Sequence, residues 1–313
     1  MDETSPQVAH WRVTLTAAVR HTGLRAVTMA AVLSAGAMLW STVVAPATSA
    51  SSGYSVHQGV DSCAVPTTSQ LNALWAGTPF HQWGYYLGGA TAQAAGCAAW
   101  SASKLATARG IGWGFTPIWD DLQAPTGCGG SFSHRMSINT STARSQGVTS
   151  ANNAQAAMLA AGFSSSDQVW LDIEGYSYTT SGCKAAVNAY VDGWSATLGT
   201  NAGVYGSATG SQVDSWASIA NPPLMVWIAA YNGPTSNPNT VWNISGVSNS
   251  HWNVDHRMHQ YRNSRTYSGI LVDVDCAVAW VDQGSTTGES ETNEVNELGS
   301  ITAEPVCPGA TQP

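Results

Sequence analysis

The chain has 313 residues, a formal net charge of −8 and only 10% charged residues. Eight Lys and Arg residues follow position 50 and they are scattered, whereas nucleic-acid phosphates are bound by clustered basic side chains. The composition therefore excludes nucleic acid as an expected partner. The length is sufficient for a single large α/β core.

Residues 1–50 have the pattern of a secretory signal peptide. Three Arg residues in the first 25 positions precede an uncharged run, 26–44, rich in Ala, Val, Leu and Met, and small residues follow at 47–50. A basic region, an apolar region and a small-residue cleavage site are the three parts of such a signal. A retained membrane anchor is the alternative, because about 19 apolar residues nearly span a bilayer. We expect cleavage, export and no stable membrane insertion of the mature chain.

The rest of the chain divides by composition into three parts. Residues 51–55 are Ser-rich and predict a linker, and residues 56–282 hold the strand-like and helix-like patterns of one barrel domain. Residues 283–313 contain five Glu and no Lys or Arg, which predicts an extended acidic C-terminal tail.

Six cysteines follow the predicted signal, and an even number in an exported chain predicts three disulfides. Six cysteines allow 15 connectivities, and the sequence alone does not choose among them. We expect sequential pairing: Cys63–Cys97, Cys128–Cys183 and Cys276–Cys307.

Eight short apolar runs predict strands at 56–61, 82–87, 111–119, 168–174, 202–206, 224–231, 256–261 and 270–275. Helix-like stretches separate the first six: 67–76, 91–109, 148–162, 182–199 and 208–220. Thr67, Ser150 and Ser181 are suitable N-caps for three of them. This alternation predicts a parallel sheet, and eight strands predict a closed (β/α)8-type TIM barrel. The last three strands lack intervening helices, so we expect five regular units and a degenerate remainder.

Carboxylates gather at the predicted strand ends, where parallel barrels carry their functional side chains. Asp172 and Glu174 are two residues apart on one strand and therefore share a face, as do Asp273 and Asp275. Asp61 ends the first strand, and Glu174 is the only glutamate between residues 51 and 288. Such a set points to glycosidic-bond cleavage, in which neighbouring negative charges keep one carboxyl protonated as the acid and a second carboxylate stabilises the developing positive charge.

Two other interpretations of these carboxylates remain open. Strand-end carboxylates can instead cap helices or accept hydrogen bonds from loop amides, and Asp273 with Asp275 could hold a cation, although no ligand-rich loop accompanies them. Neither a zinc-like Cys/His spacing nor a nucleotide-binding pattern is present, so we predict no metal and no cofactor. Trp83, Trp119 and Trp227 are the strand-borne tryptophans best suited to stack against sugar rings.

Several short motifs follow one another in a distinctive order along the barrel segment. They are Gly59-Val60-Asp61 within 59–66, Tyr85–Gly89, Pro117-Ile118-Trp119 with 123–125, Asp172-Ile173-Glu174, Gly203–Ser207, 226–229, and His259-Gln260-Tyr261 leading to 269–275. This order resembles the glycoside hydrolase family 25 (lysozyme-type) barrel, and more closely the Rv2525c-like (DUF1906) glycoside hydrolase-like domain. The resemblance covers about 56–282, and its first two cysteines support the Cys63–Cys97 pair.

The resemblance implies roles for the carboxylates. Glu174 would be the general acid, and Asp172 would orient or stabilise, or position a substrate acetamido group as an internal nucleophile. Asp61 and Asp275 would complete the catalytic set. One departure is Cys276-Ala277, where family 25 enzymes have Asn-type residues. The expected substrate contacts are Trp119, Tyr205, Trp227, Tyr231, Gln260 and Asp273.

Together these features predict an exported, monomeric, wall-associated hydrolase of β-linked polysaccharide, with peptidoglycan as the first candidate substrate. A glycan-binding module without catalysis is the main alternative. A structural envelope protein that binds no glycan is a third interpretation.

Overall fold

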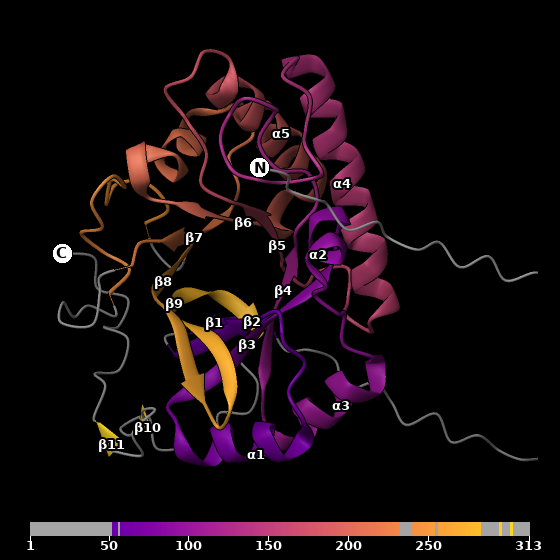
Figure 1. The fold of residues 1–313 in the computed structure, drawn as a ribbon, viewed down its shortest axis with the longest axis vertical. Coiled ribbons are helices and arrows are strands. Elements are labelled where there is room, and N and C mark those ends of the chain that lie inside the picture. The colour runs from indigo at the N-terminus through magenta and orange to yellow at the C-terminus, as the bar shows by residue number, and fades with distance from the viewer. Residues whose placement is uncertain are drawn as a thin grey trace, which may run out of the picture. The chain divides into compact units, whose positions relative to one another are not determined.

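The computed structural model (Figure 1) describes residues 52–55, 57–231, 240–253 and 256–282, together with 294–295 and 301–302. These residues belong to one compact unit, 46–313. The predicted signal peptide and most of the predicted acidic tail lie outside the described residues. Within the described part, no helix is both long enough and apolar enough to cross a membrane.

Eight strands form a closed barrel, as predicted. They are β2 (Gln58–Ser62), β3 (Phe80–Gly88), β4 (Gly114–Trp119), β5 (Val169–Ile173), β6 (Ala202–Ser207), β7 (Met225–Ala229), β8 (His256–Tyr267) and β9 (Ile270–Asp282). Neighbours along the chain pair in order from β2 to β8, all in parallel. The barrel closes because β9 pairs with both β8 and β2.

The eighth strand corrects the expectation of a fully parallel sheet, because β9 runs antiparallel to both of its barrel neighbours. Ser268 and Gly269, with φ of 50° and 76°, join it to β8 in a two-residue turn. Two positive φ values are what a tight hairpin between twisted strands requires. A two-residue turn leaves no length for a crossover helix, so the last unit of the barrel is a hairpin.

Residues 52–55, predicted as a linker, instead form strand β1 (Ser52–Ser55). This strand pairs antiparallel with the end of β9, from Ser52 opposite Asp282 to Ser55 opposite Ala279. The long β9 extends past the barrel and offers its free backbone N–H and C=O groups, which a paired strand satisfies better than a linker would. The predicted end of the domain at 282 coincides with the end of β9.

The helices are α1 (Thr68–Gly77), α2 (Ala90–Ala95), α3 (Ala102–Ile111), α4 (Thr140–Ala160) and α5 (Cys183–Leu198), with 3-10 turns η1 (Gly199–Asn201), η2 (Thr209–Ser211) and η3 (Val213–Ser218). The predicted helix 91–109 is divided into α2 and α3 because Gly96 ends α2 in a left-handed conformation. The predicted helix 208–220 is only the two 3-10 turns η2 and η3.

One predicted helix cap is confirmed and two are wrong. Thr67 accepts a hydrogen bond from the Gln70 backbone N–H in a capping box at the start of α1. Ser150 lies inside α4, which begins ten residues earlier because the Asn139 side chain caps it. Gly182, and not Ser181, precedes α5. Several small polar residues near each helix are suitable N-caps, so residue preference alone did not identify the first residue of α4 or α5.

Two disulfides confirm the sequential pairing as far as the described residues extend. Cys63–Cys97 joins the loop after β2 to the segment after α2, with Cα atoms 4.7 Å apart. Cys128–Cys183 joins the loop after β4 to the first residue of α5, with Cα atoms 5.6 Å apart. The third predicted pair includes Cys307, which lies outside the described residues.

Inward and outward side chains of the strands form two separate packing layers. The inner layer is a cluster of Ile118, Trp170, Tyr205, Met225, Trp227, Met258 and Ala277. The outward layer packs beneath the helices that surround the barrel in Figure 1 and includes Val60, Leu171, Val204 and Val226. Inside the barrel, the Trp227 ring packs edge-on against Trp170 and Tyr205. Large rings therefore fill the middle of the barrel, which leaves its polar side chains nearer the rim.

Helices α4 and α5 pack closely through two glycines, which gives a first prediction. A Cβ atom on Gly147 would lie 2.0 Å from the Tyr190 carbonyl oxygen, and one on Gly193 would lie 2.1 Å from that of Arg144. Gly147→Ala should therefore lower the free energy of unfolding by about 1–3 kcal/mol, because the backbones must separate. Urea unfolding measures this change.

Gly110→Ala is the matched control. Gly110 lies in α3, and a Cβ atom added to it would have no other atom within 4 Å. Alanine should stabilise that helix by up to about 1 kcal/mol, because glycine is the poorer helix former. Equal effects of the two substitutions would contradict the close approach of α4 and α5.

Candidate active site

The antiparallel β9 brings two predicted carboxylates to the rim where the parallel strands end. Asp273 pairs with Asp61 at the end of β2, and Asp275 pairs with Gly59 on one side and Gln260 on the other. Because β9 runs antiparallel to β2 and β8, its first residues lie beside the last residues of the parallel strands. Asp273 and Asp275 therefore belong to this end of the barrel although they begin their strand.

The β5 carboxylates lie on the inner side of the barrel. Trp170 belongs to the inner layer and Ile173 to the outer layer. Alternation along the strand then places Asp172, and Glu174 just beyond it, on the inner side. Asp172 is opposite Tyr205 of β6 and is buried, whereas Glu174 is half-buried. The more accessible of the two is therefore the glutamate.

Gln260 connects Asp61 to two tyrosines. Its side-chain Nε2 donates to Asp61 Oδ2 over 2.6 Å. Its Oε1 accepts from the Tyr205 hydroxyl at 2.8 Å and from the Tyr231 hydroxyl at 2.7 Å. In this arrangement the carbonyl end of the amide faces the two hydroxyls and its NH₂ end faces Asp61. Tyr231 is 49% exposed, so this network reaches the surface.

Asp275 lies in the floor of the site. It is buried, and its Oδ1 accepts a hydrogen bond of 3.0 Å from the Trp227 indole N–H. Burial raises the pKa of Asp275 well above its ordinary range, and the neighbouring charges of Asp61 and Asp273 raise it further. This buried site therefore favours a neutral carboxyl over several negative charges.

Asp120 and Gln123, which follow β4, belong to the site but were not among the predicted site residues. Gln123 is fully buried, and its Nε2 donates to Asp120 Oδ1 at 2.7 Å and to the Asp172 carbonyl oxygen at 2.8 Å. Its Oε1 accepts from the Glu174 backbone N–H at 2.9 Å. Gln123 thus holds the backbone on both sides of Ile173, immediately before the Glu174 side chain. The sequence signal was its place in the 123–125 motif, which carries no information on contacts.

Burial and mutual repulsion raise the pKa values of these carboxyls. Burial raises the pKa of Asp61 to about 8, with a further contribution from Asp273, and burial raises the pKa of Asp120 to about 7. The pKa of Asp172 is raised well above its ordinary range by burial and then by the charge of Glu174. Burial likewise raises the pKa of Glu174. Carboxyl groups of this site, Asp61 and Asp120 among them, are therefore partly protonated near neutral pH.

The structure separates one expected substrate contact from the others. Trp119 lies in the outer layer, where its indole N–H donates to Ser150 of α4 over 2.9 Å. Trp83 is also in the outer layer, packed against Trp100 and Trp113. The expectation that both face the pocket is therefore wrong. Trp119 follows the inward-facing Ile118 and Trp83 precedes the inward-facing Gly84, so the alternation of side chains along a strand turns both outward.

The other expected contacts lie together. Tyr205, Tyr231, Trp227, Gln260 and Asp273 are linked to the carboxylates by the bonds and pairings above. Asp273 is half-buried, and its Oδ1 accepts from the Ser264 backbone N–H at 2.6 Å. Within the described residues, no three His, Cys, Asp or Glu side chains are grouped so as to hold a metal ion.

Gln123→Leu tests the support of the site. It leaves three buried polar groups without their partner, so we expect the free energy of unfolding to fall by about 2–3 kcal/mol. Urea unfolding measures the loss. Gln146→Leu is the control, because Gln146 is only half-buried and accepts one hydrogen bond, from the Ser137 backbone N–H. A loss for Gln123→Leu no greater than for Gln146→Leu would contradict this role.

Comparisons with known proteins agree with the fold. Similar solved structures include the Tat-secreted protein Rv2525c of Mycobacterium tuberculosis, with 17% identity, a TM-score of 0.50 and coverage of 74% of this chain and 99% of that one. The Clostridium perfringens spore cortex lytic enzyme SleM has 16% identity, a TM-score of 0.42 and coverage of 71% and 67%. A family 25 glycosyl hydrolase from Bacillus anthracis has 11% identity, a TM-score of 0.40 and coverage of 72% and 89%.

Sequence comparison is more specific than these structural similarities. No curated protein matches the chain. The profile of the Rv2525c-like, glycoside hydrolase-like domain matches residues 73–279, which is more than half of the chain and includes seven of the eight barrel strands in full or nearly so. The chain therefore belongs to the family of Rv2525c-like glycoside hydrolase-like domains.

Proposed function

We propose that the mature chain is an exported glycoside hydrolase that acts on β-linked cell-wall polysaccharide, with peptidoglycan as the first substrate to test. The observation that carries this proposal is the half-buried Glu174 beside the buried Asp172, each with a raised pKa. Glycosidic cleavage needs an accessible carboxyl that is protonated near neutral pH, together with a second carboxyl. Export rests on the pattern of residues 1–50.

Each carboxyl has a role in the proposed reaction. Glu174 donates its proton to the glycosidic oxygen as the bond from that oxygen to the anomeric carbon breaks. Asp172 orients the acetamido group of the substrate, whose carbonyl oxygen attacks the anomeric carbon. Water then opens the cyclic intermediate and returns a proton to Glu174. Asp61 and Asp275 complete the carboxyl lining around the developing positive charge.

Aromatic side chains supply the sugar contact. Tyr231 is half exposed beside the carboxylates and can stack on a sugar ring or bond its hydroxyls. Trp227 is 1% exposed, so we assign it to the floor of the site and not to direct stacking. Tyr205 and Gln260 hold the orientation of Tyr231 and Asp61 through their hydrogen bonds.

A glycan-binding module without catalysis is the second candidate, and one observation favours it. The pKa values of Asp172 and Asp275 are raised well above the ordinary range, chiefly by burial. Neutral carboxyls can donate to and accept from sugar hydroxyls, but they stabilise a positive transition state less than carboxylates do. Such a site could bind a glycan and leave it intact.

Release of reducing ends from purified cell walls tests the two candidates. The mature chain with its disulfides intact should release reducing ends steadily, and the Glu174→Gln variant should not. Calorimetry with soluble muropeptides should show saturable binding by both the mature chain and the Glu174→Gln variant. Binding without any released product over several days would favour the module, and the absence of binding would favour a structural envelope protein.

A further inference from the structure

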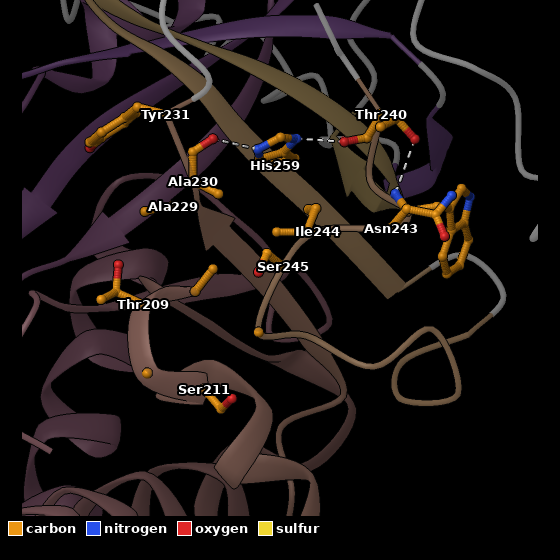
Figure 2. A pocket seen from close by; sticks show the side chains of 14 residues that line it. Thr209, Ser211, Ala229, Ala230, Tyr231, Thr240, Asn243, Ile244, Ser245 and His259 are labelled. Atoms are coloured by element: carbon orange, nitrogen blue, oxygen red, sulfur yellow. Dashed lines mark hydrogen bonds between the residues drawn. The ribbon is translucent and has the colours of Figure 1, made fainter. Parts of the chain in front are cut away.

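A cavity of about 830 Å³ (Figure 2) shares Tyr231 with the hydrogen-bond network that leads to Asp61. It is bounded by the end of β6 with η2, by the end of β7, and by the segment 240–246. Figure 2 shows Thr209 and Ser211 on one side and Ile244 and Ser245 on the other. The volume falls within the range of about 300–1,000 Å³ that is typical of small-ligand pockets.

The chemistry of the lining is neutral and rich in hydroxyl groups. Its hydroxyl, amide and imidazole side chains are those of Thr209, Ser211, Tyr231, Thr240, Asn243, Ser245 and His259, and no Asp, Glu, Lys or Arg lines it among the residues that the structure describes. Hydroxyl and amide groups match the hydroxyl and acylamino groups of sugars. Because no acidic or basic side chain was found in the lining, an ionic ligand would have no opposite charge to pair with there. The cavity therefore differs from the acidic site beside it.

The walls of the cavity are held by unusual backbone conformations. Ser211 and Asn243 both have φ of 57°, in the left-handed region that non-glycine residues seldom adopt. A Cβ atom on Gly246 would lie 2.4 Å from the Ala208 carbonyl oxygen, so glycine is needed where the two walls meet. Backbone strain of this kind persists where surrounding structure holds it and often marks ligand sites.

His259 connects two walls of the cavity. One ring nitrogen lies 2.9 Å from the Ala230 carbonyl oxygen at the end of β7, and the other contacts the Thr240 carbonyl oxygen. Figure 2 shows the ring between these two residues. The side chain is 1% exposed, so the contacts are sheltered from water. The cavity is therefore preformed and does not depend on a ligand to assemble it.

Tyr231 is shared by the cavity and the carboxylate cluster. It lines the cavity, and its hydroxyl donates to Gln260 Oε1, whose amide in turn donates to Asp61. A chain of sugars that places one unit over the carboxylates could thus place another unit in the cavity on the far side of the Tyr231 ring.

We propose that this cavity is an accessory subsite for an uncharged N-acetylated hexosamine unit of the glycan that the proposed function places at the carboxylates, and the inference rests on that function. In peptidoglycan it would accept the N-acetylglucosamine unit and not the unit whose lactyl group carries either a free carboxylate or an amide-linked peptide. The reason is the lack of any basic side chain in the lining.

Ser245→Phe fills the cavity from its exposed rim and tests the subsite. In the Glu174→Gln background, calorimetry with a neutral N-acetylglucosamine oligomer should show binding, and Ser245→Phe should weaken it about tenfold or more. Ser218→Phe, at an exposed position of η3 outside the lining, should leave the affinity unchanged. An oligomer of equal length that bears a lactyl carboxylate on every unit should bind less tightly, because no register then offers the cavity an uncharged unit.

The outcomes separate this inference from the proposed function. Equal affinity for the Ser245→Phe and Ser218→Phe variants, or no binding of the neutral oligomer, would overturn the subsite. Tighter binding of the carboxylate-bearing oligomer would do the same. If the wild-type chain releases no reducing ends while Ser245→Phe still weakens binding, the hydrolase assignment fails and the subsite stands.

Discussion

Glu174→Gln should reduce the release of reducing ends from cell walls by about 10²–10⁴-fold, the range usual for loss of a general acid. Glutamine keeps the shape of the side chain but has no proton of suitable pKa to give. Glycan binding should persist, because the amide can still bond sugar hydroxyls. A reducing-end assay together with calorimetry on the same protein preparation separates the two effects.

The same substitution should not destabilise the protein. Burial raises the pKa of Glu174, with Asp273 adding to it, so a neutral amide removes an unfavourable charge. Asp192→Asn is the matched control outside the site. The pKa of Asp192 is lowered by its bonds to Asn221 and Arg144, so this variant should lose stability and keep full activity. Undiminished activity of Glu174→Gln would show that another group is the acid.

The folded protein should lose stability as the pH rises from 6.5 to about 8. In the folded state the pKa of Asp61 is about 8 and that of Asp120 about 7, both raised first of all by burial. In the unfolded chain both carboxyls have ordinary pKa values near 4 and are ionised throughout this window. The folded state therefore binds more protons, and its stability falls as the pH passes the folded pKa values. We expect a loss of about 2 kcal/mol.

The window begins at 6.5 because a histidine acts in the opposite direction below it. Burial lowers the pKa of His81 from 6.5 to about 4, so its contribution to stability increases as the pH rises between these values. Urea midpoints at pH 6.5, 7.25 and 8 measure the loss in a range where the carboxyls outweigh the histidines. Asp61→Asn should flatten the dependence and Asp192→Asn should not. A free energy of unfolding that rises over this pH window would contradict the raised pKa values of Asp61 and Asp120.

The position of the carboxylates was predictable from local sequence, but the support around them was not. Two carboxylates at i and i+2 share a face in any strand, so Asp172 and Glu174 could be paired without coordinates. Gln123 lies in an irregular loop 51 residues before Glu174, and no periodicity connects the two. The inner or outer placement of Trp119 likewise depended on which residues of β4 face the barrel, and a nearly continuous apolar run does not show this.

By itself, the sequence predicted the closed eight-stranded barrel and the group of carboxylates at one rim, and it favoured, without deciding, the sequential cysteine pairing that the structure confirms for two pairs. These follow from short-range patterns: hydrophobic runs, the order of cysteines and the alternation of side chains along strands. Only the tertiary structure decided that β9 runs antiparallel, that Asp61 and Asp275 are both buried at the rim, and that Gln123 and Asp120 complete the site. Those features depend on contacts between residues far apart in the chain, and on the burial of charge that only the assembled barrel produces.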